Sequence, residues 1–416
     1  MGQFHDKVIE RLCRYAKIDT QSSNNSSTVP TTYKQFDLAR VLYEELGDIG
    51  VNEREIDEKA CVVYGWIPGN TEGEPLGLIA HMDTAPDAPG DNCKPRVIEH
   101  YDGSDIVLNK EKDIVMKTSV FPNLLHYIGD DLVVTDGTTL LGGDDKASIA
   151  AIMTYAEYLI AHPEIPHAKI CLAFTPDEEV GGLARDLDLA KFGSPTAYTL
   201  DGDYSGYYME ETFHADAAKL RIHGVNVHTG TAKDKMINAL HIAAQIINQI
   251  PENERPETTE GKEGFYHVYG CQGDVENTEI TFIIRDFDLD LFQKREDFLS
   301  SLVDRVNQKY GEGTAEIEFI YQYRSMKEVI KHVPWLVSEL KGAIEDAGLT
   351  PTAQAFRGGT DGSALSHRGL PCPNLSAGYE NAHSRFEYVP VQSMEKNVEI
   401  LFRLTERFLH IDKESA

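Results

Sequence analysis

The sequence is poor in basic residues. Its 416 residues include 39 lysines and arginines against 68 aspartates and glutamates, which gives a formal net charge of -29. A surface this negative repels the phosphates of nucleic acids and the headgroups of anionic lipids. We therefore expect neither a nucleic-acid partner nor a membrane partner, and we attribute most of the charge to solubility.

Paired cysteines and long apolar runs are also missing. The six cysteines are scattered, without a CxxC motif, and several have apolar neighbours. This pattern favours reduced thiols in a cytoplasm and argues against a thiolate zinc site or a cysteine nucleophile. The first 14 residues mix charges with apolar residues at helical spacing, unlike a secretory signal peptide, and no apolar run is long enough to span a bilayer.

The length exceeds what a single hydrophobic core usually serves, which favours two domains. Helical periodicity over residues 4–15, 33–46 and 146–161 alternates with short apolar runs at 61–67, 76–80, 170–174 and 197–200. Helices that alternate with buried strands predict an α/β domain around a mainly buried sheet.

The pattern changes near residues 203–211. Residues 217–223 and 279–286 alternate as strands with one buried face, and residues 236–250 and 291–310 have helical periodicity. These elements predict a smaller α+β domain over residues 210–322. Helical patterns at 329–347 and 393–408, with a short strand at 374–377, resemble the first domain again. The smaller domain is therefore predicted to be inserted into a larger one made of residues 1–209 and 323–416.

Acidic and imidazole side chains follow several predicted strands or open a helix. They are His81 and Asp83 after the strand at 76–80, Asp144 and Asp145 at the start of the helix at 146–161, Glu178 and Glu179 after 170–174, Asp201 after 197–200, and His383 in a polar segment. Taken singly, each has an ordinary explanation as a helix cap, a turn residue or a surface histidine. As a series they point to a site, because sites in open α/β sheets assemble at the carboxyl ends of the strands.

These residue types suit a pair of metal ions. Strand alternation places His81 and Asp83 on the same side, so the imidazole can bind a metal while the carboxylate orients it. Carboxylates with two imidazoles suit two Zn²⁺ ions, although Mn²⁺ or Co²⁺ would also be accepted. Of the neighbouring Glu178 and Glu179, one could bind metal while the other takes a proton from an attacking water.

Six stretches together resemble the M20 family of metallopeptidases, and within it the aminopeptidases that act on tripeptides. In order along nearly the whole chain, they are residues 81–84, 143–146, 175–181, 199–202, 227–233 and 383–387. The resemblance implies a zinc-peptidase-like catalytic domain, with a central mixed sheet flanked by helices, and an inserted α+β lid domain of the ferredoxin-like type. Two departures concern local loop shape: Thr229 stands where members often have proline, and residues 233–235 are unusually charged.

The resemblance also implies roles for individual residues. Asp83 would orient His81, and Glu178 would be the general base. Asp145 would not be a ligand, because the family places the bridging carboxylate two positions before the lysine, here Lys146. The implied ligands are His81, Asp144 and Asp201 for one metal, and Asp144, Glu179 and His383 for the other, with Asp144 as the bridge.

Three further residues are implied to act on the substrate. His228 resembles a lid histidine that would help to polarise the scissile carbonyl as the cleft closes, although a hairpin histidine beside Gly230 explains it too. Arg285 and Arg357 are candidates for binding the C-terminal carboxylate of the substrate through a bidentate contact. A structural ion pair is an equally good explanation for each arginine.

The predicted function is therefore release of the N-terminal residue from tripeptides by metal-assisted attack of water. One alternative is an M20 relative that acts on dipeptides or on N-acyl amino acids. Another is a catalytically silent peptide-binding protein with the same fold. The expected partner is a short peptide, and a homodimer is compatible with the sequence.

Overall fold

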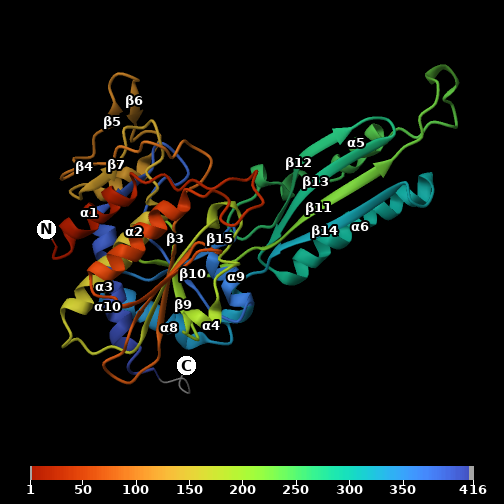
Figure 1. Ribbon diagram of the computed structural model, residues 1–416. Helices are drawn as coiled ribbons and strands as arrows, with labels where there is room; N and C mark the ends of the chain where they lie inside the picture. Colours follow the sequence, from red (N-terminus) through yellow and green to blue (C-terminus); the bar gives the residue numbers. More distant parts are fainter. Residues whose placement is uncertain (1, 412–416) are drawn as a thin grey trace. The chain divides into compact units, whose positions relative to one another are not determined.

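The computed structural model describes residues 2–411, and the chain divides into two compact units (Figure 1). Among the described residues, the first unit comprises 2–210, 326–354 and 360–411, and the second comprises 211–325 and 355–359. The boundaries predicted from the sequence, 209/210 and 322/323, lie within a few residues of this division. The assignment of residues 355–359 to the second unit was not predicted.

A mixed eight-stranded sheet forms the centre of the first unit, in the order β1-β2-β8-β3-β9-β16-β10-β15. Four central strands, β8, β3, β9 and β16, are parallel to one another. β2 pairs antiparallel with both β1 and β8, and β10 pairs antiparallel with β16. Their bounds are β1 Glu53–Asp57, β2 Val62–Ile67, β3 Leu76–His81, β8 Ile170–Thr175, β9 Ala197–Leu200, β10 Tyr207–Thr212, β15 Thr352–Phe356 and β16 Asn374–Leu375.

Helices cover both faces of this sheet, which explains why its central strands are short apolar runs. In β8, Ile170, Leu172 and Phe174 join the core under α1, α2, α3, α8 and α10, while Cys171 and Ala173 join a second core that includes residues of α4 and α9 (Figure 1). The helices are α1 His5–Tyr15, α2 Gln35–Asp48, α3 Gly143–Ala161, α4 Leu189–Phe192, α7 Lys327–Ile330, α8 Pro334–Asp346, α9 Asp361–His367 and α10 Val391–Arg407.

The prediction of a single helix at 329–347 is wrong. The structure has two helices there, α7 and α8, and α8 begins at Pro334. Proline lacks a backbone N–H and clashes inside a helix, but it is tolerated in the first turn. The apolar periodicity continues across the break, so periodicity alone did not reveal it.

A group of short strands, most of them between β3 and α3 in sequence and one directly before α10, was not predicted. One three-stranded sheet has the order β17-β7-β4, and β5 pairs with β6, around a small core of their own. The elements are β4 Arg96–Ile98, β5 Ile106–Asn109, β6 Ile114–Met116, η1 Pro122–Tyr127, β7 Leu132–Val134 and β17 Tyr388–Pro390. Strands of three or four residues are too short to show a period.

The second unit is a βαββαβ fold, which confirms the ferredoxin-like prediction. Its antiparallel sheet has the order β12-β13-β11-β14, and α5 and α6 pack on it around one core. The elements are β11 His214–His223, η3 Thr229–Thr231, α5 Ala239–Ile247, η4 Glu252–Glu254, η5 Pro256–Thr258, β12 Phe265–Gly273, β13 Asn277–Asp286, α6 Leu289–Tyr310 and β14 Ala315–Tyr323. The predicted mixed α/β architecture with an inserted α+β portion is therefore confirmed.

The cysteines are unpaired, as the sequence predicts. Cys61, Cys93, Cys171 and Cys372 are buried, whereas Cys271 on β12 is exposed. Within residues 2–411, no helix combines the length and the apolar character needed to cross a bilayer.

Candidate metal centre

Three adjacent parallel strands deliver acidic or imidazole residues to one edge of the large sheet. β3 ends at His81, β8 ends at Thr175 shortly before Glu178 and Glu179, and β9 ends at Leu200 directly before Asp201. Because the carboxyl ends of parallel strands meet at the same edge, side chains distant in sequence converge there.

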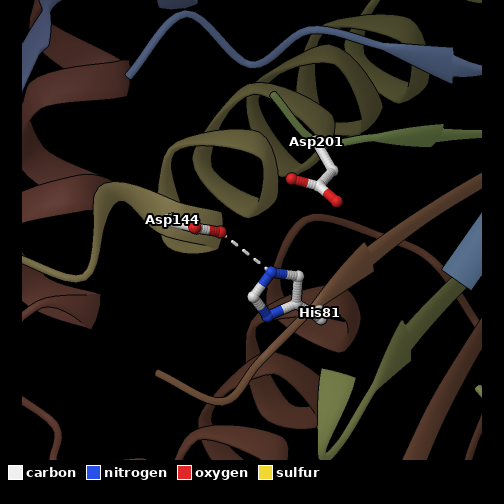
Figure 2. A group of neighbouring side chains, drawn as sticks. All are labelled: His81, Asp144 and Asp201. Atoms are coloured by element: carbon white, nitrogen blue, oxygen red, sulfur yellow. Dashed lines mark hydrogen bonds and ion pairs between the residues drawn. The ribbon is translucent and has the colours of Figure 1, made fainter. Parts of the chain in front are cut away.

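His81, Asp144 and Asp201 form one potential metal-binding group. Their ligand atoms all lie within 4.8 Å of one another, and Nε2 of His81 lies 2.9 Å from Oδ1 of Asp144. Figure 2 shows the three side chains pointing toward one another, from the end of β3, the start of α3 and the residue after β9. All three residues are buried.

Asp144, Glu179 and His383 form a second such group. Nε2 of His383 lies 2.7 Å from Oε2 of Glu179 and 3.3 Å from Oδ2 of Asp144. Asp144 therefore turns one oxygen toward His81 and the other toward His383, as a carboxylate that bridges two metal ions would. The two groups have the same members as the two ligand sets that the sequence resemblance implies.

Asp83 links His81 to the turn that carries the two glutamates. Its carboxylate accepts the backbone N–H of Glu178 at 2.9 Å and that of Glu179 at 3.2 Å. Nδ1 of His81 lies 3.2 Å from the Asp83 carbonyl oxygen and 3.4 Å from its Oδ1. The sequence suggested the contact with the imidazole. The contact with the glutamate turn depends on folding and has no sequence signal.

Asp177 anchors the same turn from the other side, and sequence reasoning did not single it out. Its buried carboxylate accepts hydrogen bonds from the backbone and hydroxyl of Thr31 and from the amide of Gln35. The φ of Asp177 is +62°, a left-handed conformation that costs free energy unless surrounding contacts hold it. These contacts fix the backbone directly before Glu178.

The charges of the cluster fit bound cations. Burial raises the pKa of Glu179 and of Asp201, and the nearby charge of Asp144 raises both further. Burial would also raise the pKa of Asp144, but hydrogen bonds from His383 and His81 outweigh it and lower this pKa. Oε1 of Glu179 is buried without a hydrogen-bond partner. A cation would satisfy this oxygen and offset the crowding of carboxylates.

The ligand atoms of the two groups also suit zinc ions. Each group offers oxygen and nitrogen atoms from three side chains, which leaves room for water or substrate on a catalytic zinc ion. Asp145 belongs to neither group, and its Oδ2 accepts the backbone N–H of His81 at 3.1 Å. The residues present therefore fit two divalent metal ions.

Glu178 lies beside this cluster but in neither ligand group. Burial raises the pKa of its carboxyl group well above the usual value, and although His81 lowers it, Asp201 and Asp361 add to the increase. A carboxyl group whose protonated form is favoured in this way can hold a proton during a reaction.

The other three candidates, His228, Arg285 and Arg357, lie in the second unit. Nδ1 of His228 accepts the N–H of Gly230 at 3.1 Å and thereby caps the 3-10 turn η3, and the residue is exposed. Nη1 of Arg285 donates to the carbonyl oxygens of Asp216 and Ile284.

Arg357 has comparable partners in the same unit. Its Nη1 donates to the carbonyl oxygens of Gly261 and Glu263, and its Nη2 donates to Oγ1 of Thr259. Both candidate arginines therefore have structural contacts, and their binding of substrate stays a prediction.

Gly143 is predicted to be essential for the shape of the loop that presents Asp144. A Cβ at this position would lie 2.4 Å from Cγ2 of Val389 and 3.1 Å from Oε1 of Glu387. We expect Gly143→Ala to destabilise the metal-free protein by about 1–3 kcal/mol through overpacking, as measured by denaturant unfolding. Gly90→Ala is the matched control, because its Cβ would meet its nearest atom at 3.4 Å. Equal stability of the two variants would contradict the prediction.

The chain is similar to known proteins over almost its whole length. The family model for the peptidase dimerisation domain matches residues 211–314. Peptidase T of Caldanaerobacter subterraneus subsp. tengcongensis is 48% identical over 404 residues, which cover 97% of this chain and 98% of the relative.

Two solved structures share the fold at low sequence identity. Aminopeptidase PepT from Bacillus cereus has a TM-score of 0.76 at 22% identity, over 97% of this chain and 98% of that chain. A tripeptidase from Staphylococcus aureus has a TM-score of 0.76 at 20% identity, over 98% of this chain and 99% of that chain. Since a relative of nearly half-identical sequence matches almost the whole chain, the chain belongs to the peptidase T family of the M20 metallopeptidases.

Proposed function

We propose that this protein is a di-metal aminopeptidase that releases the N-terminal residue from tripeptides. The observation that carries the proposal is the pair of ligand groups that share Asp144. The family membership supports peptide hydrolysis, and the names of the two structural neighbours, an aminopeptidase and a tripeptidase, support the substrate class.

We propose zinc as the metal, held by His81, Asp144 and Asp201 at one site and by Asp144, Glu179 and His383 at the other. When bound, two such ions would supply Lewis acidity for the scissile carbonyl and lower the pKa of the attacking water. Mn²⁺ and Co²⁺ are compatible with the same donors.

Within this chemistry, Glu178 is the group that moves the proton. Its carboxylate accepts the proton of the attacking water and delivers it to the nitrogen of the leaving amine. Asp83 keeps the glutamate in place by accepting its backbone N–H, and it holds the ring of His81 through Nδ1. Asp83 thus fixes a ligand mainly through its backbone carbonyl oxygen and fixes the base through its carboxylate.

The second unit is proposed to serve as a lid over the substrate. Because Nδ1 of His228 accepts a hydrogen bond from Gly230, a neutral ring carries its proton on Nε2. An Nε2–H can donate to the developing oxyanion of the scissile carbonyl. For Arg285 and Arg357 we retain the proposal that they bind the C-terminal carboxylate of the substrate, in addition to their contacts with protein oxygens.

We further propose a cytoplasmic homodimer. The match of the second unit to a peptidase dimerisation domain supports self-association through that unit, and the six unpaired cysteines suit a reducing compartment. Light scattering after gel filtration would contradict the dimer if it gave the mass of a single chain at all concentrations.

The substrate proposal is tested by the length dependence of hydrolysis. We expect release of the N-terminal residue from a tripeptide to be faster than from the matching dipeptide and tetrapeptide, and an N-acetylated tripeptide to be resistant. Preferred cleavage of dipeptides or N-acyl amino acids would instead identify another M20 activity. Binding of tripeptides without cleavage by metal-loaded protein would identify a peptide-binding protein.

The metal proposal is tested by chelation. Treatment with a strong chelator should remove two metal ions per chain and abolish tripeptide hydrolysis, and added Zn²⁺ should restore both. Saturating metal should also stabilise the fold, by about 2.7 kcal/mol for each site at 100 times the dissociation constant of that site. Full activity after both metals have been removed would refute the proposed chemistry.

A further inference from the structure

A single loop, residues 379–388, contacts the elements of both metal-binding groups. Its base is closed by two backbone hydrogen bonds between Glu380 and Tyr388, of 2.9 and 3.1 Å. The carboxylate of Glu380 accepts hydrogen bonds from Nδ2 of Asn123 at 2.8 Å and from the hydroxyl of Tyr127. Inside the loop, Oγ of Ser384 donates to the carbonyl oxygen of Asn381. The loop is therefore braced by its own backbone and by η1.

Glu387 connects this loop to the backbone that carries Asp144. Its Oε2 accepts the N–H groups of Leu141 and Gly142 at 2.9 and 2.7 Å, and its Oε1 accepts the N–H of Asp144 at 2.9 Å. Hydrogen bonds to a carboxylate are stronger than those between neutral groups. Glu387 is 1% exposed, so these three bonds replace its contact with water. They hold the chain on both sides of Gly143.

Tyr379 connects the same loop to Asp201. Its hydroxyl donates to Oδ1 of Asp201 at 2.5 Å, and the tyrosine is 4% exposed. A carboxylate with one oxygen held in this way has lost most of its freedom to rotate, and Oδ2 remains for a metal. His383, between Tyr379 and Glu387 in sequence, contacts Glu179 and Asp144 directly.

We propose that Tyr379 and Glu387 are positioning residues through which the 379–388 loop fixes Asp201 and Asp144 relative to His383. The inference rests on the proposed function only in taking the two groups as metal sites. Hydrogen bonds that fix a ligand before the metal arrives reduce the entropy lost on coordination, so their loss weakens metal binding. Tyr379 acts on the group that contains Asp201, whereas Glu387 acts on both groups because they share Asp144.

The test is the affinity of each of the two zinc ions, measured by competition with a chromophoric chelator. We expect Tyr379→Phe to lower the affinity for one of the two ions by about 10–100-fold and to leave the affinity for the other unchanged. Glu387→Gln should weaken both, because an amide loses the charge and offers one acceptor oxygen for three N–H groups. In excess zinc, Tyr379→Phe should recover kcat with an unchanged KM for the tripeptide.

Glu380→Gln is the matched control, because Glu380 is also a buried glutamate of this loop, 2% exposed, but bonds Asn123 and Tyr127 instead of the 141–144 segment. It should weaken the binding of both ions far less than Glu387→Gln does, because the two backbone hydrogen bonds of Glu380 still close the base of the loop. The inference is overturned if Tyr379→Phe binds both ions as tightly as the wild type, or if Glu380→Gln weakens them as much as Glu387→Gln.

Two further measurements distinguish loss of the positioning roles from misfolding of a variant and from failure of the proposed function. The unfolding temperature of each metal-free variant reports whether the fold survives, and Tyr379→Phe removes only one hydroxyl, so it tests the inference even if Glu387→Gln does not fold. Wild-type protein that binds fewer than two ions would refute the proposed metal centre itself, whereas two ions and unaltered variants would refute only the positioning roles.

Discussion

Glu178→Gln is expected to retain both metal ions and to lose tripeptide hydrolysis almost completely. The side chain belongs to neither ligand group, so the substitution leaves every proposed ligand in place. An amide cannot accept the proton of the attacking water, and general-base catalysis contributes about 10²–10⁴-fold to a rate. We expect kcat to fall by that factor, with two metals per chain measured by elemental analysis of the same sample.

The matched control for Glu178→Gln is Glu395→Gln, which neutralises another glutamate of the first unit. Glu395 lies on α10, is 8% exposed and lies outside both ligand groups. Its variant should hydrolyse the tripeptide at close to the wild-type rate. Normal turnover by Glu178→Gln would remove this residue from the mechanism, and loss of metal from it would mean that Glu178 acts as a ligand.

Asp144→Ala is expected to lose both metal ions. Asp201→Ala and His383→Ala should each weaken the binding of mainly one ion. The reason is that Oδ1 of Asp144 faces His81 and its Oδ2 faces His383, so both groups depend on one carboxylate. Without it, the remaining side chains leave each group with two ligands. We expect no measurable hydrolysis and no stabilisation by added zinc, as measured by metal content and by thermal unfolding with and without the ion.

Asp145→Asn tests whether the bridging role belongs to Asp144 or to the neighbouring Asp145. Asp145 is fully buried, and its Oδ2 accepts the backbone N–H of His81, a contact that the carbonyl oxygen of asparagine can keep. This variant should bind two metal ions. If it lost both while Asp144→Ala kept them, the bridging role would belong to Asp145.

Much of the fold was predictable because the buried face of a helix or strand requires apolar residues at a regular spacing in the sequence. β8 reads as an uninterrupted apolar run since both of its faces are covered, and α6 shows helical spacing because one side packs on the second sheet. Where an element is very short, as in β4 to β7, or where proline interrupts a continuing pattern, as before α8, the sequence did not indicate the boundaries.

The sequence by itself determined the family, through the resemblance of its motifs. It also indicated which residues could bind metal, because parallel strands bring the polar residues at their carboxyl ends to one edge of the sheet. Only the tertiary structure showed that Asp83 also binds the Glu178 turn, that Asp177 anchors that turn, and that Tyr379 and Glu387 hold Asp201 and the Asp144 segment. These contacts join residues that are far apart in the chain, and a hydrogen bond between distant segments leaves no local pattern in either of them.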